Sequence, residues 1–514
     1  GFNGQHLNVG NVNTASKVII ARKDRDNGVF PFSIAALITC VGAAVAFGCE
    51  KKTMLEDSPR DDNNDDHDDD DATTILNWSG THSVNVRNEH FYEPESIEEL
   101  EQVVATCHEK GLPIRPVGSA LSPNAISFQS GGMISLSNLD DIINIDKENM
   151  TVTVQAGARV SQVVEALREH GLTLPNLASI AEQQMGGFVQ IGAHGTGANI
   201  ASVDEYVTSL KLVTPAKGTI HLTAEDGELF QLAKVAIGAL GVVSEITMKC
   251  IPAHKLVEHT YVLKRSEAKT KINSLLKKHK HIRYMWIPYE DAVVVVTNDP
   301  EDNNNTQINT SENSLSVEDR MQPLTDALKQ LSKFTSKPYT DEMLTGMGFG
   351  EIRDALLALA PLDYQLVREV NKAEAEFWRK SEGYQTKPSD QLLQFDCGGQ
   401  QWVFEVCFPT GTYDDNKGKD MEFMEDLLEK IESTGIPAPA PIEQRWSAST
   451  SSLMSPSHGE KGGLHCWVGV IMYLPSDDEK ERKKISDIFK GQYCDLVRRI
   501  GLKYHIMSHW AKLE

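Results

Sequence analysis

A glutamate and an arginine two positions apart, Glu443 and Arg445, form a pair of side chains suited to chemistry. Side chains in a strand repeat with a period of two, so a strand here would place both on one face. A carboxylate and a guanidinium that converge can handle a proton and an anionic oxygen. Surface ion pairs show the same spacing, and spacing alone favours that simpler interpretation. The alternating prolines and alanines of residues 437–441 predict a stiff, extended approach to the pair.

A second candidate is the loop of residues 115–124, RPVGSALSPN, which follows the strand-like residues 112–115. Its prolines fix the backbone and Gly118 permits close approach of another group. Ser119, Ser122 and Asn124 offer hydrogen-bond donors. Such a loop is able to hold a phosphate, and it is also compatible with an ordinary turn.

Three glycine-rich blocks, residues 178–187, 192–197 and 238–247, share a composition that suits a chain lying against a flat or charged ligand. Five glycines in the first two blocks argue against a helix or an ordinary strand throughout. Each block alone could be a structural turn, but together they justify a ligand hypothesis. The sequence contains neither a Gly-x-Gly-x-x-Gly fingerprint in the right context nor a P-loop, so we expect no Rossmann fold and no P-loop.

Two residue types invite a metal or catalytic interpretation that the pattern does not favour. His194 has glycines close by on both sides, and we interpret it as a hydrogen-bonding loop residue rather than a general base. The eight cysteines are scattered and form no Cys-x-x-Cys pair, which indicates buried thiols rather than a zinc site or a disulfide framework. We predict no metal site.

Composition indicates a large globular protein with attached segments. With 514 residues, 40% of them hydrophobic, the chain can form two or three folded segments. A net charge of -23 argues against general nucleic-acid binding and suits a basic protein partner. The acidic run at residues 65–71 leads us to interpret residues 50–76 as a disordered linker rather than a metal tract.

An uncharged apolar stretch occupies residues 29–49 and follows a basic N-terminal segment, residues 1–28. Its length suffices to cross a hydrocarbon core of roughly 30 Å as a helix. We therefore predict a single transmembrane helix, with the larger C-terminal part on the side away from the basic segment. A signal peptide and a buried helix are the alternatives. Since the sequence begins with Gly1, we also expect a targeting segment upstream.

The periodicity of the sequence around these residues predicts an α+β fold. The N-terminal part shows helical periodicity at residues 98–110 and 160–169 and strand patterns at residues 133–136 and 151–155. Residues 256–440 alternate strands such as 292–297 with helices such as 366–382. Residues 299–316 are polar and indicate a mobile insertion.

The glycine-rich blocks and the RPVGSALSPN loop, in this order, resemble the flavin-binding domain of the vanillyl-alcohol-oxidase superfamily. Shorter segments narrow the likeness to the L-galactono-1,4-lactone dehydrogenase family: NWSGT at 77–81, LVTPAKGTI at 212–220, WIPY at 286–289, CGGQQW at 397–402, PAPAPIEQRW at 437–446 and HWAK at 509–512. The resemblance covers nearly all of residues 77–514. It implies a two-subdomain PCMH-type FAD-binding domain at 77–255 and an α+β cap domain at 256–514 that carries the HWAK element.

The resemblance implies that FAD is the cofactor and is bound noncovalently, because Leu121 replaces the histidine that tethers the flavin in many superfamily members. Ala178 matches a small residue thought to limit access of oxygen to the flavin. The residues expected to contact FAD are Pro116, Val117, Gly118, Ser119, Ala120, Leu121, Ser122, Asn124, Ala178, Ser179, Ile180, Gly186, Gly187, Gly192, His194, Gly195, Thr196, Gly197, Val243, His509 and Lys512.

The resemblance also reverses the interpretation of the Glu443 and Arg445 pair, because the Glu-x-Arg pair of the family lies at the substrate. Glu443, Arg445 and Lys512 become the expected catalytic residues. Lys512 would favour a reduced, anionic flavin, and its alternative is a solvated lysine near the chain end. The family usually continues beyond the HWAK element into another segment, whereas this sequence stops at Glu514, so that segment is either not included in this sequence or lost.

The activity implied is oxidation of L-galactono-1,4-lactone to L-ascorbate, with cytochrome c as electron acceptor. The implied location is the mitochondrial inner membrane, with the catalytic part facing the intermembrane space. An association with assembly of respiratory complex I is implied as a second role. The alternatives are an oxygen-using sugar or lactone oxidase and a mainly non-catalytic, membrane-tethered assembly partner.

Overall fold

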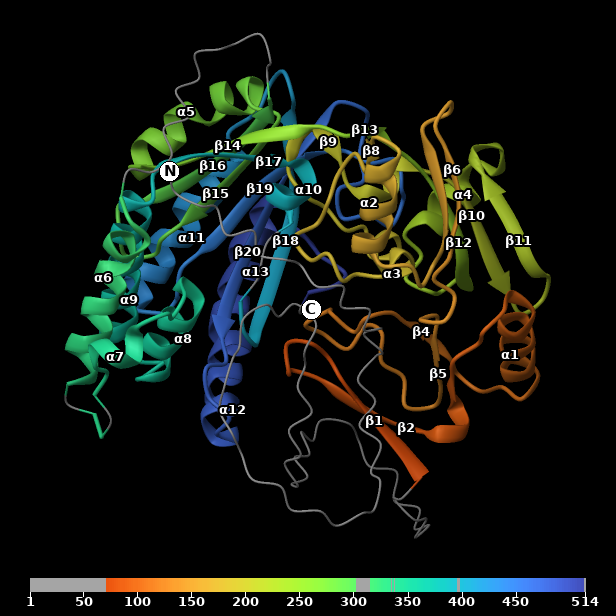
Figure 1. Ribbon diagram of the computed structural model, residues 1–514, viewed down its shortest axis with the longest axis horizontal. Helices are drawn as coiled ribbons and strands as arrows, with labels where there is room; N and C mark the ends of the chain where they lie inside the picture. The colour runs from red at the N-terminus through yellow and green to blue at the C-terminus, as the bar shows by residue number, and fades with distance from the viewer. Residues whose placement is uncertain (1–70, 302–314, 334, 337, 395–397, 513–514) are drawn as a thin grey trace, which may run out of the picture.

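Two groups of sheets and helices make up the computed structural model (Figure 1), which describes residues 71–301, 315–333, 335–336, 338–394 and 398–512. The N-terminal group contains a two-stranded, a three-stranded and a five-stranded sheet, and the C-terminal group is built on one nine-stranded sheet. A short two-stranded pair, β8 (Leu172–Thr173) and β13 (Ile251–Pro252), lies at the end of the first group. This mixture confirms the predicted α+β class.

The three-stranded sheet is parallel and carries the RPVGSALSPN loop at one strand end. Its strands are β3 (Phe91–Tyr92), β5 (Met133–Ser135) and β4 (Arg115–Val117). Helix α1 (Ile97–Glu109) precedes β4 and begins at Ser96, whose hydroxyl accepts a hydrogen bond from the Glu99 N–H. Beside this sheet lies the antiparallel hairpin of β1 (Ala72–Leu76) and β2 (Ser83–Arg87).

The five-stranded sheet is antiparallel in the order β11-β10-β12-β7-β6. In β7, Val152 and Val154 are buried and alternate with half-buried neighbours, as expected for a strand with one face on a core. The remaining bounds are β6 (Ile142–Asp146), β7 (Thr151–Gln155), β10 (Val207–Thr214), β11 (Gly218–Thr223), β12 (Val242–Lys249), α2 (Val160–Glu169), α3 (Met185–Gln190) and α4 (Glu228–Lys234).

The nine-stranded sheet forms the backbone of the C-terminal group, in the order β17-β14-β16-β15-β19-β20-β18-β21, with β9 pairing in parallel with β19. Its strands are β9 (Gly197–Ala201), β14 (Lys255–Leu263), β15 (His281–Trp286), β16 (Val293–Pro300), β17 (Gly383–Pro388), β18 (Gln401–Thr412), β19 (Ile442–Ala448), β20 (Gly463–Tyr473) and β21 (Met507–Ser508). Because β9 directly follows the glycine-rich loop 192–197, this pairing joins the two groups.

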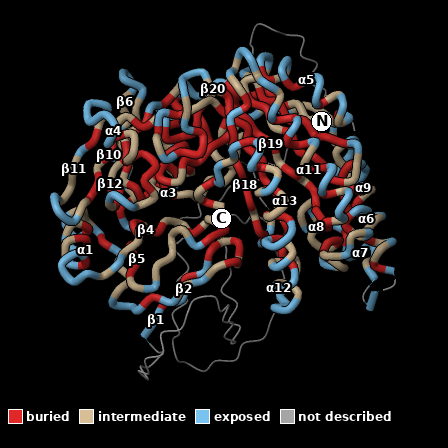
Figure 2. Tube along the Cα trace, turned by 180° about the vertical axis from the view of Figure 1, so that it is seen from behind, coloured by how far each residue is buried: buried red, intermediate tan, exposed pale blue. Residues whose placement is uncertain are grey.

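Helices cover the two faces of this sheet unequally. One face packs on α5 (Arg265–Lys278), α11 (Lys419–Thr434), α12 (Glu479–Ile488) and α13 (Asp495–Gly501). On the other face α9 (Tyr364–Lys380) covers part of β15 and β16, and it is backed by α6 (Val317–Ser332) and α8 (Phe349–Ala358), with α7 (Asp341–Leu344) and α10 (Ser389–Leu393) as short additions. Buried residues concentrate in the strands, while α1, α7 and α12 keep exposed residues on their outer sides (Figure 2). The part of the second face that α9 does not cover meets the N-terminal group, where His194 contacts Glu405 of β18.

Several predicted boundaries change. The linker expected at residues 50–76 extends too far, because residues 72–76 form strand β1, in which Thr73 and Ile75 are buried. The strand expected before the RPVGSALSPN loop begins only at Arg115, and the first glycine-rich block contains the short helix α3 despite Gly186 and Gly187. The helix and strand predicted at 160–169 and 151–155 are confirmed.

Residues 29–49, predicted to span a membrane, lie outside the described residues, as do most of the expected linker and residues 302–314 of the expected insertion. Within the described ranges no helix combines the length and the apolar character that a membrane crossing requires.

Candidate active site

A pocket in the N-terminal group is walled by three segments that the sequence had singled out. Its empty space, which includes the part open to solvent, is about 880 Å³. The walls come from residues 115–122, 183–191 and 237–243. The predicted residues that line it are Pro116, Val117, Gly118, Ser119, Ala120, Leu121, Ser122, Gly186, Gly187 and Val243.

The backbone shapes this pocket for an anionic, elongated ligand. Ala120 has φ of 49°, in the left-handed region that occurs in backbone nests, whose successive N–H groups bind anions. A side chain at Gly238 (φ 79°) would lie 3.1 Å from Pro116, so glycine lets these two walls approach. A Cβ at Gly187 would meet nothing within 4 Å. These features fit the phosphates and flat ring of FAD.

Two polar side chains of this loop form hydrogen bonds that hold the loop in place. The Ser119 hydroxyl donates to the carbonyl of Glu182 at 2.6 Å. The Asn124 amide donates to the carbonyls of Trp510 and Lys512 at 2.8 and 2.6 Å. Asn124 therefore connects the pocket loop to the HWAK element, and its contact with FAD stays a prediction.

Other predicted FAD contacts lie beyond this wall. Gly192 faces Ser455, 3.4 Å from its would-be Cβ, and a Cβ at Gly195 would clash with the Leu177 carbonyl at 2.3 Å. The Thr196 carbonyl meets His281 Nδ1 at 2.9 Å, and Gly197 opens β9. These contacts explain the four residues by their structural roles in the fold. The remaining predicted residues outside the wall are Ala178, Ser179, Ile180, His194, His509 and Lys512, and direct binding of FAD by any of this group stays a prediction.

The expected catalytic pair lies on β19, at the part of the nine-stranded sheet that α9 leaves uncovered. Glu443 and Arg445 are on one face as the period of two requires, and Arg445 Nε is 3.6 Å from Glu443 Oε2. Arg283, directly opposite Arg445 on β15, brings its guanidinium to 3.7 Å from Glu443 Oε1. The Glu443 side chain keeps 24% exposure while Arg445 is buried. Glu443 is thus the more accessible group of this pair.

A second carboxylate contacts Arg445 more closely. Glu405 on β18 is buried, and its Oε1 lies 2.5 Å from Arg445 Nη2 and 3.2 Å from His194 Nε2. Burial by itself raises the pKa of Glu405, but Arg445 and then His194 stabilise the carboxylate more strongly, and the pKa lies well below its usual value. Glu405 is therefore ionised at neutral pH.

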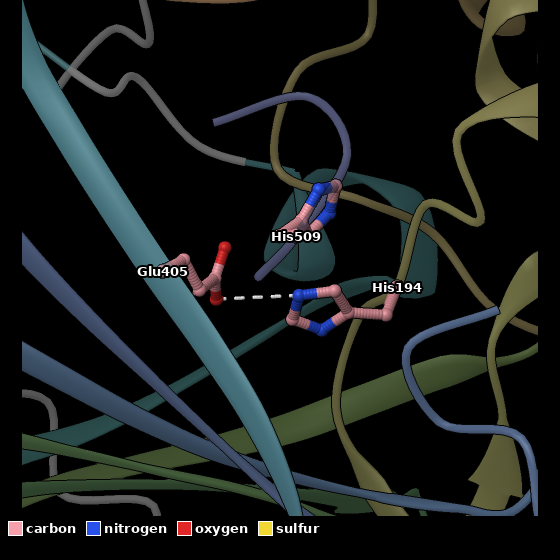
Figure 3. A group of neighbouring side chains, drawn as sticks. All are labelled: His194, Glu405 and His509. Carbon is pink, nitrogen blue, oxygen red and sulfur yellow. Dashed lines mark ion pairs between the residues drawn. The ribbon is translucent and has the colours of Figure 1, made fainter. Parts of the chain in front are cut away.

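His194 and His509 complete this cluster from two other segments (Figure 3). The His194 ring stacks on Trp467 with centroids 3.7 Å apart, and burial, reinforced by Arg445, lowers its pKa. Burial also holds the pKa of His509 well below its usual range, and its Nδ1 accepts a hydrogen bond from the Ala511 N–H at 3.0 Å. Both ring nitrogens of His194 face acceptors, Nε2 the Glu405 carboxylate and Nδ1 the Gly195 carbonyl, each at 3.2 Å. The lowered pKa favours a neutral ring with one N–H, and we place that N–H on Nε2, toward the charged acceptor. The hydrogen-bonding role expected of His194 is what the loop shows.

The ligand atoms of His194, Glu405 and His509 lie within 4.8 Å of one another, a spacing that a metal ion could use. Glu405 Oε1 is already shared by the Arg445 guanidinium and the His194 ring. A metal cation would lie against that guanidinium and would repel it. We interpret the cluster as an ion pair braced by hydrogen bonds.

Sequence reasoning missed Glu405, Arg283 and Trp467. Charged residues inside otherwise apolar strands, Glu405 in QWVFEVCF and Arg283 in HIRYMW, are a usable signal, because a buried charge requires a partner. Trp467 carried no signal, since its role as a stacking surface for His194 depends on contact between distant segments.

Comparisons with known proteins agree with this geometry. Residues 89–224 match the FAD binding domain family, and residues 246–513 match the family described as D-arabinono-1,4-lactone oxidase. The L-galactono-1,4-lactone dehydrogenase, mitochondrial, of Arabidopsis thaliana is 48% identical over 450 residues, which is 86% of this chain and 73% of the relative. This chain belongs to the L-galactono-1,4-lactone dehydrogenase family.

Further relatives support this membership. The L-galactono-1,4-lactone dehydrogenase 2, mitochondrial, of Oryza sativa subsp. japonica is 46% identical over 86% of this chain and 76% of its own length. A solved structure, a solvent-stable cholesterol oxidase, is 15% identical with a TM-score of 0.64, over 85% of this chain and 86% of its own, and shows the fold. The expected PCMH-type FAD-binding fold and the FAD cofactor are thereby confirmed, and this member of the lactone dehydrogenase family is an oxidoreductase.

Proposed function

We propose that this protein oxidises L-galactono-1,4-lactone to L-ascorbate and passes the electrons to cytochrome c. The observation that carries the proposal is the partly exposed Glu443 carboxylate beside the Arg445 guanidinium, on the sheet face joined to the FAD pocket through Asn124. The names of the relatives, which share about half of their residues with this chain, support the choice of lactone.

In this proposal the side chains of the chain bind and orient the substrate. Arg445 presents a fixed fork of N–H donors to the lactone oxygens and stabilises negative charge as it develops. Glu443 orients a substrate hydroxyl and accepts its proton. FAD, when bound, supplies the acceptor for the hydride. Lys512, whose carbonyl is fixed by Asn124, places a cation near the same region.

The first test is anaerobic addition of L-galactono-1,4-lactone to the purified holoprotein, with the yellow flavin absorbance as readout. Rapid loss of that absorbance supports the proposed half-reaction. An oxidised spectrum that persists in flavin-loaded protein contradicts it. L-Gulono-1,4-lactone added in parallel measures the preference of the site between the two lactones.

Replacement of Glu443 by Gln tests the proton acceptor separately. Gln keeps the size of the side chain but cannot take a proton at neutral pH, so the rate of reduction by lactone should fall by about 10²-fold to 10⁴-fold. Stopped-flow reduction of the variant measures this. A rate close to that of the wild type would remove Glu443 from its assigned role.

The electron acceptor distinguishes the main alternative, an oxygen-using lactone oxidase, which the name of the family matched by residues 246–513 favours. Ala178 and Leu121 argue for the dehydrogenase by the family resemblance. Reduced protein mixed with cytochrome c or with oxygen should reduce cytochrome c much faster than it forms hydrogen peroxide. Rapid peroxide formation would support the oxidase. The net charge of -23 would steer a basic electron carrier toward the protein.

The proposed setting is the mitochondrial inner membrane, anchored by residues 29–49 with the catalytic part in the intermembrane space. The names of both plant relatives include the word mitochondrial. A role in assembly of respiratory complex I remains a second proposal. Recovery of a stable complex with membrane-protein assembly intermediates, from protein that shows no flavin turnover with lactone, would favour assembly as the main role.

A further inference from the structure

The two carboxylates beside Arg445 differ in exposure and in closeness. Glu405 is only 2% exposed and lies 2.5 Å from Arg445 Nη2. The Glu443 side chain is 24% exposed and 3.6 Å from Arg445 Nε, and it is also within 3.7 Å of Arg283. A buried carboxylate in short contact with a guanidinium is expensive to move, because separation would leave both charges unpaired in the interior. Glu443 has the looser contacts.

The sheet register explains how Arg445 reaches a carboxylate two strands away. Gly469 on β20 stands opposite Glu405 of β18 and opposite Glu443 of β19, so the three residues form one row across the sheet. Arg445 belongs to the adjacent row, opposite Trp467. Because Gly469 has no side chain, β20 places nothing between the two carboxylates in this row, and Arg445 in the neighbouring row contacts both of them.

Glu405 is also held from the side of the FAD-binding group. His194 donates to its carboxylate at 3.2 Å, and the His194 ring is itself fixed by stacking on Trp467. The Glu405 carbonyl accepts the N–H of His509 at 3.0 Å, which fixes the backbone of the strand against the HWAK element. The carboxylate thus connects β18, the glycine-rich loop and the C-terminal segment at one point.

We propose that Glu405 is the positioning residue of Arg445. Its buried carboxylate neutralises the guanidinium and fixes its orientation, so that Glu443 is free to interact with the substrate. This inference rests on the proposed function for the role of Arg445 toward lactone. Glu405 touches neither substrate nor the reacting atoms, and it acts through Arg445 alone. His194 acts one step further out, by holding Glu405.

The deciding experiment is a cycle of Glu405→Gln, Arg445→Met and the double variant in the holoprotein, with anaerobic reduction by L-galactono-1,4-lactone as readout. Gln is isosteric but uncharged, so it should no longer fix the orientation of the Arg445 guanidinium. The rate of flavin reduction should fall by about 10²-fold, as for a misplacement of roughly 1 Å. In the Arg445→Met background the same change should alter the rate by no more than about twofold. An equal loss in both backgrounds overturns the proposal, and so does a normal rate in Glu405→Gln.

Two further variants separate positioning from general damage to the fold. Glu405→Asp keeps the charge and should recover most of the rate lost in Glu405→Gln. Glu374→Gln is the matched control, since Glu374 is an equally buried glutamate on α9 whose pKa is raised by burial, and its rate should equal that of the wild type. If Glu405→Asp is as slow as Glu405→Gln, the charge is not the reason for the effect and the proposal fails.

Thermal unfolding of the same holoproteins gives a readout that does not depend on turnover. Glu405→Gln and Arg445→Met should each lower Tm, and the double variant should lower it by less than the sum, because no unpaired charge remains buried. Additive shifts would overturn the pairing. If lactone fails to reduce the wild-type protein, the proposed function falls, and this cycle still decides whether Glu405 and Arg445 act as one unit.

Discussion

Arg445 contacts two carboxylates through one planar guanidinium, and its chemistry depends on that shape. Glu405 takes Nη2, while Glu443 lies near Nε on the side that is still exposed. A guanidinium keeps its charge at all relevant pH values and presents its donors in a fixed fork. One residue can therefore be anchored at one edge and still offer donors to a substrate at another.

Replacement of Arg445 by Lys should show this dependence. An ammonium is a point charge that cannot satisfy Glu405 and a lactone in the same geometry. The expected loss of kcat is about 10²-fold, comparable to removal of one donor from a preorganised anion site. Steady-state kinetics with cytochrome c measure it, and kcat and KM equal to those of the wild type would contradict the role of the fork.

Leu121 determines, at the residue scale, whether FAD is bound covalently. It lines the pocket, and its hydrocarbon side chain offers no nucleophile for a bond to the flavin. Denaturation in acid should therefore release all FAD into the supernatant, where absorbance measures it. Flavin that stays with the precipitated protein would show a covalent link through another residue.

At the scale of elements, the site depends on the register of four neighbouring strands. β18, β20, β19 and β15 place Glu405, Glu443, Arg445 and Arg283 on one face because residues opposite each other in antiparallel strands point to the same side. The pocket also depends on the placement of secondary-structure elements, because α3 and the turn before β12 supply two of its walls. A shift of one residue in any of these strands would turn the charged row to the opposite face.

Gly469 provides the test of this register. A Cβ here would lie 3.8 Å from Glu405 Cγ, an ordinary contact, so Gly469→Ala should keep near-normal activity. The larger Val side chain would crowd the Glu405 carboxylate and the Arg445 guanidinium that it holds, and Gly469→Val should reduce the rate of lactone reduction by about 10²-fold. Because this crowding strains the buried ion pair, Tm should fall as well. Equal rates in the Ala and Val variants would show that the gap is not needed.

At the scale of the whole molecule, the site is held together by contacts between segments that are far apart in the chain. Asn124 bonds the HWAK element, Gly197 pairs with Ser447, and the pair Arg168 and Asp390 joins α2 to α10. Closing the interface also buries histidines as neutral rings. Burial lowers the pKa of His82, His281 and His465 to about 4.

These histidines predict how stability depends on pH. The unfolded chain binds protons at each histidine below about pH 6.5, whereas folded His281 stays neutral down to about pH 4. The unfolded state therefore binds more protons in this window, and the free energy of unfolding should fall as the pH is lowered. His281 alone should account for about 2 kcal/mol between pH 7 and pH 5.

Urea unfolding at the two pH values measures this dependence. His281→Asn is the matched variant, and it should lose about the share of the pH dependence attributed to His281. A free energy of unfolding that stays constant or rises from pH 7 to pH 5 would contradict the prediction.

The sequence by itself determined the local features. Alternation over residues 151–155 and the helical period over 160–169 specify β7 and α2, and the spacing of Glu443 and Arg445 places them on one face, because these periods are properties of the backbone. Gly118 and the prolines of residues 115–124 were compatible with a ligand loop for the same local reason. Tertiary structure alone decided that Glu405 pairs with Arg445, that Asn124 donates hydrogen bonds to the HWAK element, and that the His194 ring stacks on Trp467. Each of these contacts joins residues separated by tens to hundreds of positions, and their meeting depends on strand order and register, which no local pattern contains.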